Sequence, residues 1–157
     1  MSRIYILNRQ QNVPGKIGQV WDFFSDPGNL QLITPADLGL KIISGNLLAK
    51  MHEGQIIEYN VSPLFNIRLY WKTGITKVKN NEYFVDEQVS GPYNMWRHEH
   101  YFKENDGYVE MTDIVHYRLP LWFLGDIAHA LFVKKKLERI FDYRFKKTEE
   151  IFNRLIK

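Results

Sequence analysis

The stretch FVDEQVSGPYNMWRHEHYF, residues 84–102, alternates large apolar and polar side chains on either side of a central turn. Alternation with a period of two is typical of β-strands, and Gly91-Pro92 supplies the turn chemistry that joins two of them. A second such stretch, MTDIVHYRLP, follows at residues 111–120 after a turn at Asn105-Asp106-Gly107. Pro120 ends this strand because it has no amide hydrogen to give to a neighbour. Short turns between successive strands predict antiparallel pairing.

The same period extends outward from this region. We expect strands at residues 3–12, 38–44, 54–62, 66–78, 82–90, 94–103 and 109–119. Two short helices are expected between the first and second strands, at residues 16–25 and roughly 27–33. In the first, Ile17, Val20 and Phe24 recur at helical spacing. The second ends before Thr34-Pro35, because a residue that precedes proline avoids the helical region.

A long helix is predicted from Gly125-Asp126 to about Leu155. Its expected apolar stripe consists of Ile127, Leu131, Phe141, Phe145, Ile151, Phe152 and Leu155, flanked by Leu137 and Ile140. A helix with one apolar stripe needs a broad apolar surface to lie on. A strongly curved antiparallel sheet of about seven strands provides that surface, so the pattern predicts an α+β fold with a space between sheet and helix.

Several motifs resemble a known superfamily. VWDFFSDPGNL at residues 20–30, followed by ITP at 33–35, resembles the helix pair of the helix-grip (SRPBCC) superfamily, which includes START domains, polyketide cyclase-like proteins and birch-pollen-allergen-like proteins. The two stretches quoted first are similar to a bacterial ligand-binding branch that is sometimes labelled as cell-division inhibitors. Members of that branch can be joined to a sugar-epimerase-like domain. The resemblance covers nearly the whole chain and implies a helix-grip fold with a cavity, but no particular reaction.

Composition limits the class of protein. The chain has 157 residues, of which 45% are hydrophobic and 15% aromatic, and this suits one folded domain spanning residues 1–157. It contains no cysteine, which excludes disulfides, thiol nucleophiles and thiolate metal sites. No apolar run approaches the length of about 18 residues that a membrane helix needs. The apolar stretch Ile4–Leu7 is too short for a signal peptide, so we expect a cytoplasmic location.

Basic residues concentrate near the carboxyl end of the chain. The formal net charge is +3, and most of the excess comes from Lys134, Lys135, Lys136, Arg139, Arg144, Lys146 and Lys147. Such a run can attract phosphates, but no nucleic-acid-binding motif accompanies it. We interpret it as a solvated helix face, and we expect neither nucleic-acid binding nor stable membrane insertion.

Strand alternation predicts which side chains face the interior. On the last strand, Asp113 falls in the otherwise apolar inner row of Met111, Val115 and Tyr117. On the preceding strand, the inner row is Trp96, His98, His100 and Phe102. On the strand before that, the assignment of Phe84, Asp86 and Gln88 to the interior depends on pairing, because the apolar count favours the other face.

Pairing brings the polar members of these rows together. The first hairpin places Asp86 opposite His98. The second pairs Asp113 with His98 or with His100, depending on whether its turn is centred between Asn105 and Asp106 or one residue later. Cross-strand partners on one face lie about 4.5–5.5 Å apart at Cβ. Either register therefore predicts one patch that contains both carboxylates and both histidines.

Three interpretations of this patch remain open. A buried His–Asp pair can satisfy itself and fix the sheet register. A few polar groups in an apolar cavity are also the usual arrangement of a small-molecule site. Finally, His98 and His100 point the same way, so a divalent metal is geometrically possible, and a histidine oriented by Asp113 or Asp86 can act as a general base.

We favour a binding protein for a small hydrophobic or amphipathic molecule, held between the sheet and the long helix, without a metal or cofactor. The expected ligand contacts are Tyr59, Trp71, Asp86, Gln88, Trp96, His98, His100, Asp113 and Tyr117. One alternative is a cofactor-independent cyclase, dehydratase or hydrolase, with His98 as base and Asp113 or Asp86 as its partner. Another is an accessory domain that acts with an epimerase-like partner.

Overall fold

The structure of the protein is a computed structural model that describes residues 3–44, 50–63, 66–120 and 122–155. Within these residues, a seven-stranded sheet has the order β1-β7-β6-β5-β4-β3-β2, with antiparallel pairing throughout. The strands are β1 (Tyr5–Pro14), β2 (Lys41–Ile42), β3 (Ile56–Val61), β4 (Leu69–Lys79), β5 (Tyr83–Ser90), β6 (Met95–Asn105) and β7 (Tyr108–Arg118).

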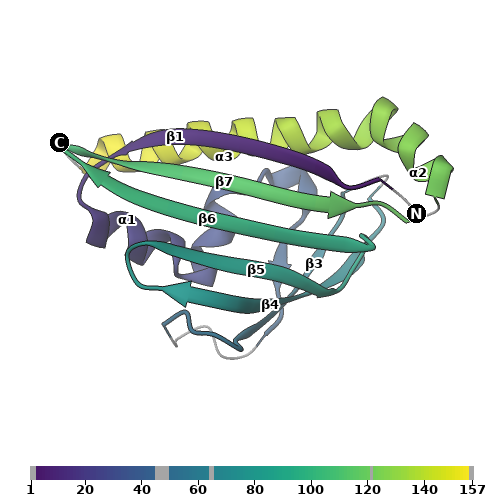
Figure 1. Cartoon of the computed structure of the whole chain (residues 1–157), viewed down its shortest axis with the longest axis horizontal. Helices are drawn as coiled ribbons and strands as arrows, with labels where there is room; N and C mark the ends of the chain where they lie inside the picture. Colours follow the sequence, from purple (N-terminus) through teal and green to yellow (C-terminus); the bar gives the residue numbers. More distant parts are fainter. Residues whose placement is uncertain (1–2, 45–49, 64–65, 121, 156–157) are drawn as a thin grey trace.

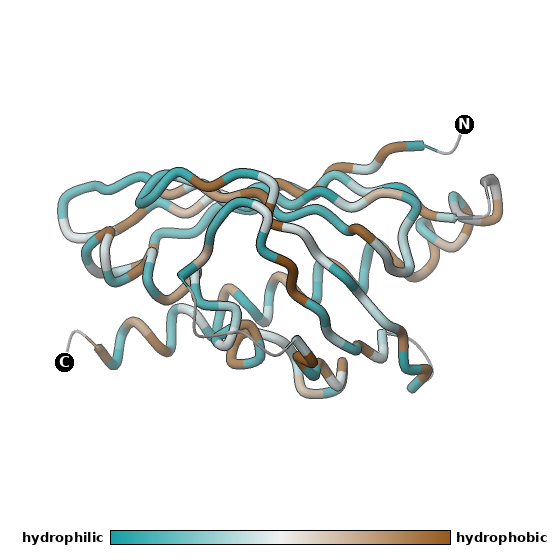
Figure 2. Tube along the Cα trace, turned by 90° about the horizontal axis from the view of Figure 1, so that it is seen from below, coloured by the Kyte–Doolittle hydropathy of each residue, from teal (hydrophilic) through white to brown (hydrophobic). Residues whose placement is uncertain are grey.

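Helices form the second layer of the molecule. They are α1 (Ile17–Phe24), η1 (Pro27–Ile33), η2 (Ala36–Leu38), α2 (Trp122–Ala128), the π-helical turn η3 (His129–Val133) and α3 (Lys134–Leu155). α3 runs along the length of the sheet (Figure 1), and α3 and the short helices lie together on one side of it (Figure 2). Within the described residues, no helix is both long and apolar enough to cross a membrane.

The predicted fold class is confirmed, with local differences. The second short helix is a 3₁₀ helix, and a further 3₁₀ turn, η2, occupies the beginning of the strand expected at 38–44. Gly39 follows η2 with φ of 54°, a left-handed conformation that glycine adopts without strain. The chain therefore enters the sheet only at Lys41, and β2 is two residues long.

The register of the strands settles one alternative that the sequence left open. β6 and β7 are joined through Asp106-Gly107, with Gly107 at φ of 80°, and this turn pairs His100 with Asp113. On the other side of β6, His98 pairs with Asp86 of β5, as expected. Of the two turns considered from the sequence, the one at Asp106-Gly107 is therefore correct, and the one centred between Asn105 and Asp106 is not.

The apolar stripe of the long helix differs from the prediction. The buried residues of α3 are Leu137, Phe141, Thr148 and Phe152. By contrast, Ile127 and Leu131 are 52% and 57% exposed. They lie in α2 and η3, and the wider π-helical turn shifts the helical phase between these residues and α3. Phe145 and Leu155 are also exposed, so the buried face of α3 is narrower than predicted.

One end of the space between sheet and helix is filled. We call this region the closed core; its buried members are Val13, Val20, Trp21, Phe84, Phe102, Val109, Met111 and Phe152. Trp21 of α1 packs edge-on against Phe84 and Phe102, with ring centroids 6.0 and 5.5 Å apart. Each such side chain contributes about 1.5–3 kcal/mol through burial. Because α1 fills this end, an internal space can persist only further along the sheet.

Candidate functional site

A cavity of about 480 Å³ lies between the inner face of the sheet and the helices. Its walls are mostly apolar and come from distant parts of the chain. Representative members are Leu30 and Ile33 of η1, Ile57 of β3, Ile75 of β4, and Leu137 and Phe141 of α3. The curvature of the sheet keeps its central strands away from α3, so these side chains surround the space without filling it.

Four aromatic residues form one wall of this cavity, which we call the aromatic wall: Tyr59, Trp71, Tyr93 and Trp96. Trp71 lies at its centre, stacked on Tyr59 with centroids 5.8 Å apart and edge-on to Trp96 at 5.3 Å. The indole Nε1 of Trp71 is buried and has no hydrogen-bond partner among the described residues. The wall therefore offers a large aromatic surface together with the buried, unpaired donor of Trp71.

Two residues that we expected to contact a ligand have other roles. Gln88 holds the turn between β5 and β6: its Nε2 donates to the carbonyl of Tyr93 at 2.6 Å, and the Tyr93 amide donates to its Oε1 at 3.2 Å. Tyr117 packs in a separate apolar cluster and its hydroxyl lies 2.8 Å from Nε2 of His129. Neither side chain lines the cavity, as far as the described residues define it.

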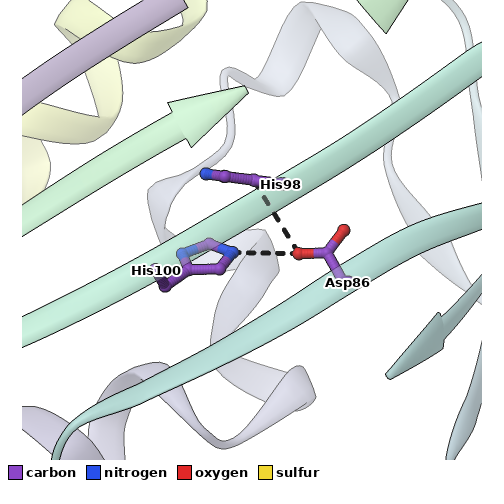
Figure 3. Close-up of side chains that lie close together, drawn as sticks. All are labelled: Asp86, His98 and His100. Carbon is purple, nitrogen blue, oxygen red and sulfur yellow. Dashed lines mark hydrogen bonds and ion pairs between the residues drawn. The ribbon is translucent and has the colours of Figure 1, made fainter. Parts of the chain in front are cut away.

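Asp86, His98, His100 and Asp113 form a compact group that we call the His–Asp cluster. Nε2 of His98 lies 2.8 Å from Oδ1 of Asp113, and Nε2 of His100 lies 2.9 Å from Oδ2 of Asp86. Nδ1 of His98 is 3.8 Å from that same Asp86 oxygen, so the two histidines converge on one atom (Figure 3). The predicted patch of two carboxylates and two histidines is thus present, and Asp86, His98 and His100 line the cavity.

Aromatic neighbours hold both imidazoles in place. Phe84 stacks on His100 with centroids 4.0 Å apart and an interplanar angle of 21°. Phe141 of α3 lies edge-on to His98 at 5.5 Å, and the two imidazoles lie 3.7 Å apart. Because packing and carboxylates restrict both rings, their nitrogen atoms have defined directions.

Burial and charge oppose one another in this cluster. Burial raises the pKa of both carboxyl groups, but the histidines outweigh it and hold the pKa of Asp86 and of Asp113 below the ordinary value. For His100, the two carboxylates outweigh burial and raise its pKa. Burial, helped by the charge of His100, lowers the pKa of His98. The pKa values of the two histidines are therefore shifted in opposite directions, upward for His100 and downward for His98.

Arg144 of α3 also lines the cavity, although the sequence places it in a run of basic residues that we interpreted as solvated. Its guanidinium lies 5.0 Å from the ring centroid of Phe141, and its buried Nε has no hydrogen-bond partner within the described structure. Its charge is one of the influences that lower the pKa of Asp86. The spacing in the sequence could have indicated this position, because Arg144 follows Phe141 by three residues and precedes Thr148 by four, which places all three on one helix face.

Asp113 was predicted as a ligand contact, whereas Tyr93 was not. Asp113 is buried behind the histidines, beside a second, small pocket rather than beside the main cavity. Tyr93 was missed because it follows Gly91-Pro92 in a turn, where alternation carries no information. Its half-buried side chain nevertheless packs against Trp71 and Trp96, and desolvation raises its pKa.

Solved structures share this architecture at low sequence identity. The Zhui aromatase/cyclase of a Streptomyces species has a TM-score of 0.76 at 12% identity, over 99% of this chain and 97% of that chain. Major latex-like protein 151 of Panax ginseng has a TM-score of 0.67 at 12% identity, over 95% and 97%. A nucleoside-diphosphate sugar epimerase of Corynebacterium glutamicum has a TM-score of 0.62 at 23% identity, over 92% of this chain and 28% of that chain.

No protein-family model and no curated protein matches the sequence. The structural likenesses extend over nearly the whole chain, and they include a cyclase-type protein and a major latex-like protein. This agrees with the seven-stranded antiparallel sheet and the long carboxyl-terminal helix described above. The chain therefore has the helix-grip fold, as its motifs predicted.

Proposed function

We propose that this protein binds a small hydrophobic or amphipathic molecule in the cavity between its sheet and α3. The observation that carries the proposal is the cavity itself: about 480 Å³ of mostly apolar space with a few polar groups at its wall. Ligand sites commonly measure about 300–1,000 Å³ and combine apolar walls with a small number of polar groups that fix orientation.

The wall chemistry favours a ligand with an apolar body and an acceptor oxygen. The aromatic wall suits a flat or ring-bearing body, because aromatic faces stack favourably. Nε1 of Trp71 and Nε of Arg144 are buried donors without partners in the described structure. Leaving a buried donor unpaired costs about 1–3 kcal/mol, so a ligand that accepts a hydrogen bond from either one gains affinity.

A second function, catalysis without an organic cofactor, is favoured by one feature of the cluster. His98 lines the cavity, its lowered pKa keeps it neutral, and Asp113 fixes its orientation through Nε2. A neutral histidine that is held by a carboxylate is the usual general base. Nδ1 of His98, however, faces Asp86 at 3.8 Å. Binding is therefore the stronger proposal, because it uses the whole cavity.

The test fills the cavity and measures the binding of a probe. The probe is 8-anilinonaphthalene-1-sulfonate, an amphipathic anion whose fluorescence rises in apolar surroundings. Ile140→Trp places a large side chain at a cavity-lining position of α3, whereas Leu155→Trp places one at a 65%-exposed position on the same helix. We expect Ile140→Trp to weaken probe binding at least tenfold and Leu155→Trp to leave it unchanged.

Native mass spectrometry of freshly purified protein provides the complementary measurement. A co-purified organic molecule that is present in wild type and Leu155→Trp but lost in Ile140→Trp supports the proposal and identifies the ligand class. Equal probe affinity in wild type and in a folded Ile140→Trp variant overturns it. Circular dichroism confirms that each variant is folded.

A further inference from the structure

The three cavity-facing members of the His–Asp cluster have the arrangement of a metal site. Asp86 of β5 and His98 and His100 of β6 each offer one ligand atom, and these atoms lie within 4.8 Å of one another. All three are on the wall of the cavity. Figure 3 shows that both imidazoles of β6 lie beside the Asp86 carboxylate of the neighbouring strand β5.

Asp113 determines which nitrogen atoms are available. Its Oδ1 is hydrogen-bonded to Nε2 of His98 at 2.8 Å and lies 3.0 Å from Nδ1 of His100. The remaining nitrogens, Nδ1 of His98 and Nε2 of His100, lie 3.8 and 2.9 Å from Oδ2 of Asp86. A carboxylate behind each ligating histidine is the usual second layer of a metal site, because it fixes the ring and increases the basicity of the free nitrogen.

The surroundings also suit a cation. Asp113 is buried and Asp86 is partly buried beside an apolar cavity, and desolvation of such charges is costly unless an opposite charge lies close by. The packing of Phe84 on His100 and of Phe141 on His98 restricts both rings before any ion binds. A site whose ligands are already oriented loses little entropy when the ion binds.

We propose that Asp86, His98 and His100 bind a divalent transition metal such as Zn²⁺, with Asp113 as a positioning residue. Two imidazoles and one carboxylate are donors that borderline metals of this class prefer. Ligand bonds of about 2.0–2.2 Å require only small movements of the three groups toward a common centre. Three protein ligands leave a coordination position open, and here the ligands border the cavity.

The test uses the metal alone. Protein treated with a chelator and then freed of it is titrated with Zn²⁺ in a calorimeter, and with Co²⁺ while its visible absorption is recorded. We expect one equivalent to bind, and the Co²⁺ complex to show the d–d bands of a low-symmetry nitrogen and oxygen site. His100→Gln and Asp86→Asn should each lower affinity at least 100-fold. Asp113→Asn should lower it about 10–100-fold, as loss of an outer partner does.

His52→Gln is the matched control, because His52 is an exposed histidine outside the cavity. It should leave both the affinity and the Co²⁺ spectrum unchanged. If His100→Gln does not fold, Asp86→Asn decides, because Asp86 is the most exposed member of the cluster, with 17% of its side chain accessible. Absence of binding by wild type, wild-type affinity in a folded variant of the cluster, or loss of binding in His52→Gln overturns the proposal. The probe experiment contains no metal, so either proposal can fail alone.

Discussion

The closed core and the His–Asp cluster lie next to each other on the same strands, yet their chemistry is opposite. Along β6, Phe102 belongs to the closed core, and His100, two residues earlier, belongs to the cluster. Along β7, Met111 is followed two residues later by Asp113. The same inner face thus changes from apolar to ionisable within one pleat repeat.

The difference lies in what covers each region. Trp21 of α1 fills the space above Phe84 and Phe102, so this end is solid. Asp86, by contrast, borders the cavity. Phe84 is the boundary, because one of its neighbours is Trp21 and another is His100. The comparison shows that a single sheet can provide both stability and a site, with the division set by the elements that lie against it.

The largest expected effect is on the closed core. Phe152→Ala removes a ring that is 1% exposed and packs against Phe23 and Phe24. We expect the free energy of unfolding to fall by about 3–5 kcal/mol, as is typical for Phe-to-Ala changes in a core. Leu155→Ala, on the same helix at a 65%-exposed position, should change it by less than about 0.5 kcal/mol. Equal effects in denaturant unfolding would show that the closed core is not the main source of stability.

The next effect concerns the cluster. Asp113→Asn keeps the shape of the side chain but removes the charge that both histidines face. We expect a loss of about 2–3 kcal/mol, because hydrogen bonds to charged groups are worth about 1.5–3 kcal/mol. Glu110→Gln, on the opposite face of β7, is the control. A stabilised Asp113→Asn protein would instead indicate that the cluster lowers stability, as functional sites often do.

The two histidines should titrate apart in the metal-free protein, although an isolated histidine has a pKa of about 6.5. Nuclear magnetic resonance of the imidazole nitrogens should place the pKa of His100 above that value and that of His98 below it. Protonated His100 contributes stability that is fully present below pH about 6.5 and is lost as the pH rises through its folded pKa. His100→Gln should lack this loss. Coincident titration of both rings would contradict these opposite shifts in pKa.

The smallest effect is expected on the outer face of the sheet. Arg97 bonds Glu99 at 2.7 Å and also contacts Glu87, with 33% of its side chain exposed. Ion pairs of this kind contribute about 0–1 kcal/mol. Arg97→Ala should therefore lower stability by less than about 1 kcal/mol and leave probe binding unchanged. A double-mutant cycle with Glu99→Ala measures the pair, and a coupling well above this range would mean that the outer face shapes the site.

Much of the site could be predicted because strands obey a strict alternation. Asp113 in an apolar row, and His98 and His100 two residues apart, identify one face without knowledge of the fold. Gln88, placed inside by strand pairing, and Tyr117, placed inside by alternation, were both expected to contact a ligand, but the face on which a side chain lies does not say what lies opposite it. Gln88 instead reaches the turn backbone, and Tyr117 reaches His129.

The sequence by itself determined most of the strands, the antiparallel pairing of successive ones, the long helix and the row of ionisable groups, since these depend on local periodicity and on turns. The tertiary structure placed β1 beside β7. Only the tertiary structure decided that β6 and β7 turn at Asp106-Gly107, that Tyr93 completes the aromatic wall, and that Arg144 enters the cavity. A basic residue on a helix is ordinarily solvated. Whether such a residue is solvated or faces the cavity depends on how the helix is rotated against the curved sheet. Contacts between residues far apart in the chain set that rotation.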